Sequence, residues 1–306
     1  MLPVEQRSDR ERKRVESPPS KENAGQQNTL ALSSITDKPA YRVGLPQFMS
    51  VDYVPFLDPN RPDESTRISV EHLRRHLARY PDGHAAMSFE LVLGEGGFHP
   101  GRRDFFRALM EVAKEYGVPV MVDEIQTFGR TPELFAYQYF GLDEFVDVVT
   151  VGKLLQVCAT LFREDFKPGP GLLSQTFTSS AAAIHAARTI VTELMEGDHF
   201  GPDGKIARLH DHFEKRLGEM AERHPGLIEG PFGIGAMIAF TPLGGAADKV
   251  KEFVHALFEE GVISFYCGSD PTRARFLVPV AAITVEEIDH VLAIVEKTLL
   301  QVGNAS

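Results

Sequence analysis

The chain has 306 residues, 43% of them hydrophobic and 25% charged, with a formal net charge of −11 and a pI near 5.5. These values are ordinary for a soluble protein of one large or two medium domains, and they argue against nucleic acids and anionic membranes as partners. No run approaches the ~18 apolar residues of a membrane span, and no secretory signal is visible. The two cysteines, Cys158 and Cys267, are too few for a disulfide framework and wrongly spaced for zinc, so we predict a cytoplasmic protein without a metal site.

Residues 1–28 are almost devoid of large apolar side chains. Because such a segment cannot offset the entropy lost on ordering, we predict a disordered tail. From Thr29 onward apolar periodicity appears, and it persists to about Val302.

Helices and strands alternate up to about residue 190. Ser69 is predicted to cap a helix that runs through Arg79, and Gly117 to close an amphipathic helix over 102–116. The near-continuous apolar run of 118–122 suits a parallel strand buried on both faces. The other elements predicted here are strands over 85–93 and 146–151, followed by the segment 157–162, and a helix over 179–196 that opens at Ser179-Ser180.

Beyond residue 190 the pattern is that of a smaller α+β unit, with no internal repeat. Its predicted elements are helices over 202–222, 247–259 and 284–300 and strands near 234–240, 262–266 and 274–278. We therefore predict an α/β protein in which residues 29–190 form a large domain with a mainly parallel sheet and residues 191–306 a C-terminal small domain.

An acidic residue and a lysine end two successive strands of the large domain. Asp123 follows 118–122, and Lys153 follows 146–151. Ligands of open α/β sheets bind at the carboxyl ends of the strands, so both side chains are expected at that edge. They are the two protein groups that pyridoxal phosphate (PLP) needs: a lysine that holds its aldehyde as a Schiff base, and an acid that keeps its ring nitrogen protonated.

Two nucleotide-binding alternatives compete for these motifs. An apolar run followed by Asp123-Glu124 is also typical of the Walker B strand of nucleoside triphosphatases, but that site requires a phosphate loop. The sequence Gly201-Pro-Asp-Gly-Lys205 has the wrong spacing for such a loop. The glycines at 230, 233 and 235 are too loosely ordered for a dinucleotide fingerprint.

Over residues 29–306 the chain resembles the class III (ω-) aminotransferases, which are PLP-dependent enzymes of fold type I, the aspartate aminotransferase-like fold. It looks closest to the branch of 4-aminobutyrate and L-lysine 6-aminotransferases. The motifs that carry the resemblance are Glu90-Leu-Val-Leu-Gly-Glu95-Gly-Gly, Val-Asp123-Glu-Ile-Gln126-Thr-Phe-Gly-Arg-Thr, Val-Gly-Lys153, Gln-Thr176-Phe and Arg275-Phe-Leu-Val-Pro.

The resemblance implies a role for each cofactor-binding position. Lys153 holds PLP and moves a proton, and burial beside a cationic ring lowers the pKa of such a lysine. Asp123 pairs with the ring nitrogen, and Gln126 bonds the 3-hydroxyl of the ring. Thr176 reaches the phosphate in the neighbouring subunit, which implies a homodimer with shared active sites.

The resemblance also implies a substrate switch. Arg275 binds a substrate carboxylate, and Glu95 pairs with Arg275 when that carboxylate is absent. One pocket can then accept both a terminal-amine donor and an α-keto acid. The implied activity is transfer of an amino group from a donor of the 4-aminobutyrate or lysine type to an α-keto acid.

The resemblance fails at the front of the chain. Relatives in this family are usually considerably longer there, and their phosphate-binding turn has no counterpart in this sequence. Gly25-Gln-Gln-Asn occupies the expected place of the aromatic residue that stacks on the ring. We therefore expect an N-terminally truncated member, a frameshift or a misassigned start. The alternatives are an inactive homologue that serves as a dimerisation or regulatory partner, and another PLP reaction such as racemisation or decarboxylation.

Overall fold

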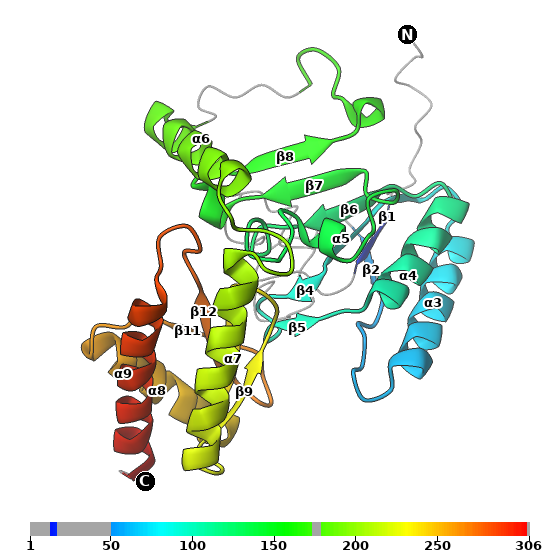
Figure 1. Ribbon diagram of the computed structural model, residues 1–306. Coiled ribbons are helices and arrows are strands. Elements are labelled where there is room, and N and C mark those ends of the chain that lie inside the picture. Colours follow the sequence, from blue (N-terminus) through cyan, green and yellow to red (C-terminus); the bar gives the residue numbers. More distant parts are fainter. Residues whose placement is uncertain (1–12, 17–49, 173–178, 305–306) are drawn as a thin grey trace.

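Residues 13–16, 50–172 and 179–304 are described by the computed structural model (Figure 1). The first part of the chain builds a six-stranded sheet in the order β2-β1-β3-β6-β7-β8, and all neighbouring pairs are parallel except β7 and β8. The prediction of a mainly parallel sheet is therefore confirmed. The strands are β1 (Lys13–Glu16), β2 (Val51–Tyr53), β3 (His84–Glu90), β6 (Val120–Asp123), β7 (Val148–Val151) and β8 (Ala159–Phe162).

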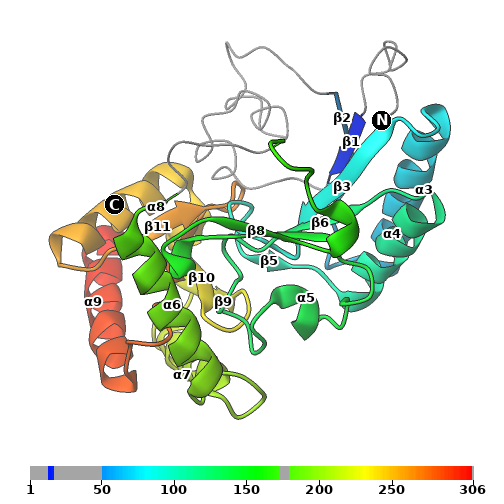
Figure 2. The same cartoon turned by 90° about the horizontal axis from the view of Figure 1, so that it is seen from above.

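Two helices, α3 (Pro62–Arg79) and α4 (Arg103–Glu115), lie side by side next to this sheet (Figures 1 and 2). Phe105 and Phe106 lie on the buried face of α4. Helix α4 belongs to the crossover connection between β3 and β6, which a parallel pair of strands requires. Gly117 ends α4 as predicted. Its φ is +64°, and Val118 N donates to Ala113 O at 2.8 Å, as in a Schellman motif.

The prediction that Ser69 caps a helix is wrong, because α3 begins seven residues earlier. Pro62 lies in the first turn, where its fixed φ suits a helix and its missing N–H is not needed. Ser69 is buried inside the helix, and its hydroxyl lies 2.8 Å from both Pro55 O and Ser65 O. The strand predicted over 85–93 is also divided into β3 and β4 (Val92–Leu93), and β4 pairs with β5 (His99–Pro100).

Residues 13–16 fall within the segment predicted to be a disordered tail, yet they form β1 between β2 and β3. A segment without an apolar face can still be ordered when its backbone forms hydrogen bonds to a neighbouring strand on each side. The other residues of 1–28 lie outside the described part of the chain.

The second unit is built on an antiparallel sheet in the order β11-β12-β10-β9. Strand β9 was not predicted, because Gly230-Pro231 interrupts its side-chain alternation; proline is tolerated there because β9 lies at an edge. Helices α8 and α9 lie on the opposite side of the molecule from α3 and α4 (Figures 1 and 2). The elements are α7 (Lys205–Arg223), β9 (Ile228–Phe232), β10 (Met237–Pro242), α8 (Ala247–Glu259), β11 (Phe265–Cys267), β12 (Arg273–Leu277) and α9 (Val285–Asn304).

Helix α6 (Ala181–Glu196) connects the two units. Ser180 caps it by accepting a hydrogen bond from Ala183 N at 3.1 Å. Ala187 belongs to the core under the large sheet and Leu194 to the core of the small unit. The predicted domain boundary near residue 190 falls within this helix and stays a prediction. Within the described ranges, the structure contains no helix of the length and apolarity needed to span a bilayer.

Candidate active site

The carboxyl ends of three neighbouring parallel strands bring polar side chains to one level. Glu90 of β3 pairs in register with Asp123 of β6, and Asp123 pairs with Thr150 of β7. Asp123 is only 5% exposed, and its Oδ1 accepts hydrogen bonds from Thr150 Oγ1 at 3.2 Å and Ile125 N at 3.0 Å. The Asp123 carboxylate is thus held at the sheet edge where ligands of this architecture bind.

Lys153 follows β7 by two residues and lies at the same edge. Its φ is +45°, a conformation that costs about 1 kcal/mol or more for a residue with a Cβ. At the preceding Gly152, a Cβ would lie 3.0 Å from Ile125 Cδ1 and 3.2 Å from Cys158 Sγ, so the chain passes closely over the turn after β6. Strained backbone of this kind is concentrated at functional sites.

The environment of Lys153 favours its neutral amine. The pKa of Lys153 is lowered from 10.5 to about 8, chiefly by burial and also by the positive charge of Arg275, while Cys158 opposes the shift. At pH 7 roughly a tenth of the amine is then neutral, far more than for an exposed lysine. This supplies the protonation state that nucleophilic attack and proton abstraction require.

Replacing Lys153 by methionine is expected to stabilise the cofactor-free chain at pH 7 by about 1–3 kcal/mol, because the buried ammonium is lost. In the wild type the unfolded state binds more protons between pH 8 and 10.5, so stability should rise with pH across that window. Urea unfolding at pH 7 and pH 10 measures both effects. Lys167→Met, at an exposed lysine paired with Glu164, is the control, and an equal effect there would contradict the prediction.

Three further predicted site residues meet at this edge. Arg275 of β12 donates from Nη1 to Gln126 Oε1 at 3.2 Å, and its Nη2 forms an ion pair with Glu95. Arg275 is 5% exposed, so the pair is shielded from water. The small unit therefore supplies an arginine to a site whose other members come from the large unit.

The turn that carries Glu95 lies directly against Gln126. A Cβ at Gly94 would fall 2.5 Å from three atoms of the Gln126 side-chain amide, so a larger residue there would force this amide to move. Glu90, at the end of β3, accepts a hydrogen bond from Gly94 N at 2.7 Å. Glu90 thus fixes the position of the Gly94 backbone.

Glu124 is a site residue that the sequence analysis did not assign. Its side chain is fully buried and accepts hydrogen bonds from Thr127 Oγ1, Ala136 N and Tyr137 N, the last two at 3.0 and 2.9 Å. Its own N–H donates to Thr150 O at 2.9 Å. Glu124 therefore ties the turn after β6 to the end of β7 and to the start of α5 (Ala136–Tyr139).

Replacing Glu124 by glutamine is expected to destabilise the chain by about 1–3 kcal/mol, and by more at pH 5 than at pH 8. The new NH2 group would face a backbone N–H. Burial raises the pKa of Glu124 to about 7, although the three hydrogen bonds oppose this shift. The wild type should therefore lose stability as the pH rises from 4.5 to 7. The glutamine variant should lack this pH dependence. Urea unfolding at both pH values is the measurement. Glu111→Gln, at an exposed partner of Arg107, is the control; identical pH slopes for the Glu124 variant and wild type would refute the prediction.

Arg130 was also missed, although it lies in the motif around Asp123. It is buried, it donates from Nη1 to Gln126 O at 2.9 Å, and burial lowers its pKa to about 10. Thr176, the residue predicted to reach a phosphate, lies outside the described residues.

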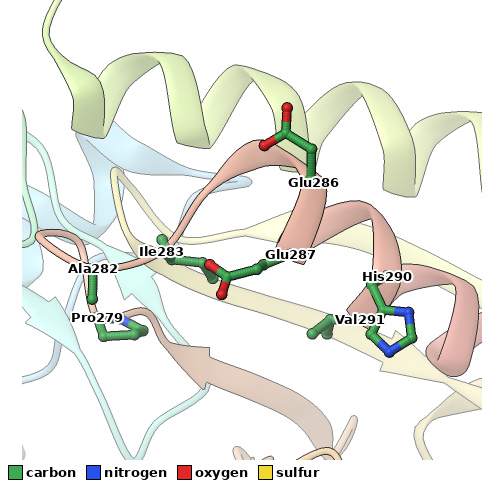
Figure 3. Close-up of a pocket in the computed structure, with 7 residues that line it drawn as sticks. All are labelled: Pro279, Ala282, Ile283, Glu286, Glu287, His290 and Val291. Atoms are coloured by element: carbon green, nitrogen blue, oxygen red, sulfur yellow. The ribbon is translucent and has the colours of Figure 1, made fainter.

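Two of the cavities formed by the described residues lie in the small unit. One, of about 550 Å³, lies at the start of α9 (Figure 3), where Glu287 and Thr284 exchange hydrogen bonds as a capping box. The other, of about 360 Å³, reaches Arg275 but is otherwise lined mostly by apolar residues. Neither contains Lys153 or Asp123, so we place the site by its chemistry rather than by cavity volume.

Comparisons with known proteins identify the family and the fold. Residues 25–299 match the family model described as Aminotransferase class-III. Acetylornithine aminotransferase of Archaeoglobus fulgidus is 30% identical over 273 residues, which cover 87% of this chain and 64% of that protein. L-lysine-epsilon aminotransferase of Mycobacterium tuberculosis is 29% identical over 282 residues, which cover 88% of this chain and 60% of that protein.

The solved lysine aminotransferase from M. tuberculosis, in the internal aldimine form, superposes with a TM-score of 0.81 at 24% identity. The match covers 95% of this chain and 67% of that one, and it confirms the predicted fold type I. The chain spans less than two thirds of the length of the curated relatives named above. The match to the family model over most of its length shows that the chain belongs to the class III aminotransferases.

Proposed function

We propose that the chain is a PLP-dependent aminotransferase that moves an amino group from a terminal-amine donor to an α-keto acid. The observation that carries this proposal is the lysine of lowered pKa at the end of β7, next to the strand that ends in a buried aspartate. A lysine and an acid in this arrangement serve PLP chemistry, which is also the chemistry of the family.

The residues present suit the cofactor. A neutral Lys153 amine can bond its aldehyde, the buried Asp123 carboxylate can pair with its ring nitrogen, and the Gln126 amide can bond its 3-hydroxyl. The hydrogen bond that Gln126 Oε1 accepts from Arg275 Nη1 orients the amide. When bound, PLP supplies a ring that accepts electrons from the reacting carbon of the substrate.

Lys153 Nζ would then accept the proton from the amine-bearing carbon of the donor. A base with a pKa near 8 is suited to this task at neutral pH, because it is partly neutral and still binds a proton well. The positive charge of Arg275 helps to hold the pKa of Lys153 down, so the residue proposed to bind substrate also tunes the base.

The ion pair between Arg275 and Glu95 would let the site bind both substrates, opening for one and staying closed for the other. An α-keto acid brings a carboxylate that can replace Glu95 on the guanidinium, and planar arginine–carboxylate pairs are strong and directional. A donor that presents a terminal amine leaves the pair intact. The two relatives above are named for acetylornithine and for the epsilon position of L-lysine, which favours the terminal-amine class of donor.

We further propose a homodimer. Helix α6 exposes apolar side chains, among them Ile184 and Met195 at 53% and 61%, and the neighbouring edge strand β8 exposes Leu161 and Phe162. Exposed apolar surface of this kind is typical of an interface. A homodimer is also what the predicted role of Thr176 requires. The cytoplasmic setting stays a prediction.

Titration of the purified chain with PLP, followed by visible absorbance, tests the proposal directly. Addition of 4-aminobutyrate or L-lysine should then convert the bound cofactor to its amine form, and an α-keto acid should restore it. Binding without conversion would support the inactive dimerisation partner. Release of carbon dioxide without a keto product would instead indicate decarboxylation. Inversion of the configuration at the amine-bearing carbon of the substrate, without a keto product, would indicate racemisation. The absence of any absorbance change on addition of PLP would contradict the cofactor assignment.

A further inference from the structure

The turn that carries Glu95, residues 94–98, is held by the small unit, and two of the contacts come from arginines of β12. We call this segment the Glu95 turn. Arg275 contacts Glu95, and two residues earlier on β12 Arg273 donates from Nη1 to Gly97 O at 2.5 Å. Alternate residues of a strand lie on the same face, so the two arginines face the same turn. Only the first of these contacts belongs to the substrate switch described above.

Arg273 is set in a rigid environment. It is 6% exposed, and its guanidinium lies 3.5 Å from the ring centroid of Phe232 on β9. A planar cation stacked on an aromatic face at this distance is held in one orientation. The ring of Phe232 and the carbonyl of Gly97 both contact this guanidinium.

The peptide between Gly97 and Phe98 is locked at both ends. Its oxygen accepts the hydrogen bond from Arg273, and the N–H of Phe98 donates to Leu93 O at 2.8 Å. Gly97 has φ +119° and Phe98 has φ +56°, and a bulky residue adopts such a value only when its surroundings enforce it. The hydrogen bond from Arg273 contributes to holding this conformation.

This strained conformation places the turn against Arg275. The fully buried Phe98 ring lies 5.5 Å from the Arg275 guanidinium carbon, and Glu95 pairs with the same guanidinium. Glu95 O also accepts a hydrogen bond from Gly268 N at 2.9 Å, at the hairpin between β11 and β12. Relaxation of the peptide held by Arg273 would therefore loosen Glu95 as well.

We propose that Arg273 is a positioning residue that holds the Glu95 turn closed on Arg275, and that it thereby sets how strongly Glu95 competes with a substrate carboxylate for that arginine. The link to substrates rests on the proposed function. Loss of Arg273 shifts the turn toward an open state, in which carboxylates bind Arg275 more easily and donors that need the closed pair bind less well.

The first test concerns the cofactor-free chain. In Arg273→Met the backbone amides of the Glu95 turn should exchange hydrogen about tenfold faster than in the wild type, because a buried charged hydrogen bond is lost. Glutarate, used as the carboxylate probe in calorimetric titration, should bind about threefold to tenfold tighter. Arg273→Lys, which keeps the charge but not the planar stack, should fall between the two. Arg223→Met, which removes an equal charge from the pair with Glu296 on α9, should leave both values unchanged.

The second test is steady-state kinetics of the PLP-loaded chain. Arg273→Met should raise KM for the amine donor about threefold to tenfold, leave KM for the keto acid equal or lower, and change kcat little. Unchanged exchange in the Glu95 turn, weaker glutarate binding, or an equal rise of both KM values would each overturn the proposal. Failure of the proposed function would appear differently, as a wild-type chain that does not transaminate, while the exchange and glutarate experiments would still decide the role of Arg273.

Discussion

Replacement of Lys153 by alanine is expected to abolish amino-group transfer, with a loss of at least about 10⁴-fold in kcat/KM. The variant lacks both the amine that would hold PLP and the base that would take the proton from the donor. It should also lose the visible absorbance band that marks covalently held PLP. The measurements are absorbance after gel filtration in the presence of PLP and keto-acid formation from an amine donor.

The matched control for this variant is Lys167→Ala. Lys167 is exposed and paired with Glu164, and it lies beyond β8, away from the strand ends that form the site. The Lys167→Ala variant should retain both the cofactor and the activity. Turnover by Lys153→Ala close to that of the wild type would contradict the assignment of Lys153.

Replacement of Asp123 by asparagine is expected to lower the rate of the donor half-reaction by about 10²-fold or more. The amide is similar in size but carries no negative charge, so it cannot keep the ring nitrogen of the cofactor protonated. The amide oxygen could still accept hydrogen bonds from Thr150 Oγ1 and Ile125 N, so the fold should persist. Single-turnover absorbance with an amine donor measures the rate.

Asp147→Asn is the control for the Asp123 variant, because Asp147 serves the opposite end of the same strands. Its Oδ2 accepts a hydrogen bond from Val120 N at 2.9 Å, at the start of β6. This variant should lose about 1 kcal/mol of stability and keep the half-reaction rate. Equal rate losses in the two variants would show that Asp123 acts through the sheet and not through the cofactor.

Local chemistry explains which elements the sequence predicted well. The structure confirms the helix over 247–259 at both ends, and it confirms Gly117 and Ser180 as helix-terminating and helix-capping residues. Each depends on contacts within a few residues along the chain. Ser69 was misassigned because a serine that bonds back to a preceding carbonyl inside a helix looks the same in sequence as a capping serine.

The elements that the sequence missed depend on partners distant in the chain. Strand β9 contains Gly230-Pro231, and it forms a strand because it pairs with β10 at the edge of the sheet. The four residues of β1 lack an apolar pattern, and their order comes from pairing with strands on both sides. Burial of Glu124 likewise follows from the position of α5, which the motif around Asp123 does not encode.

The amino-acid sequence by itself determined the family, the mainly parallel sheet and the positions of Asp123 and Lys153 at strand ends, because an apolar run that stops at a polar residue marks both the strand and its end. The tertiary structure alone decided how Arg275 meets Glu95, 180 residues away, and why Arg273 matters to that pair. The reason is physical: those contacts arise when the small sheet packs against the Glu95 turn, and no periodicity along the chain records the geometry of that packing.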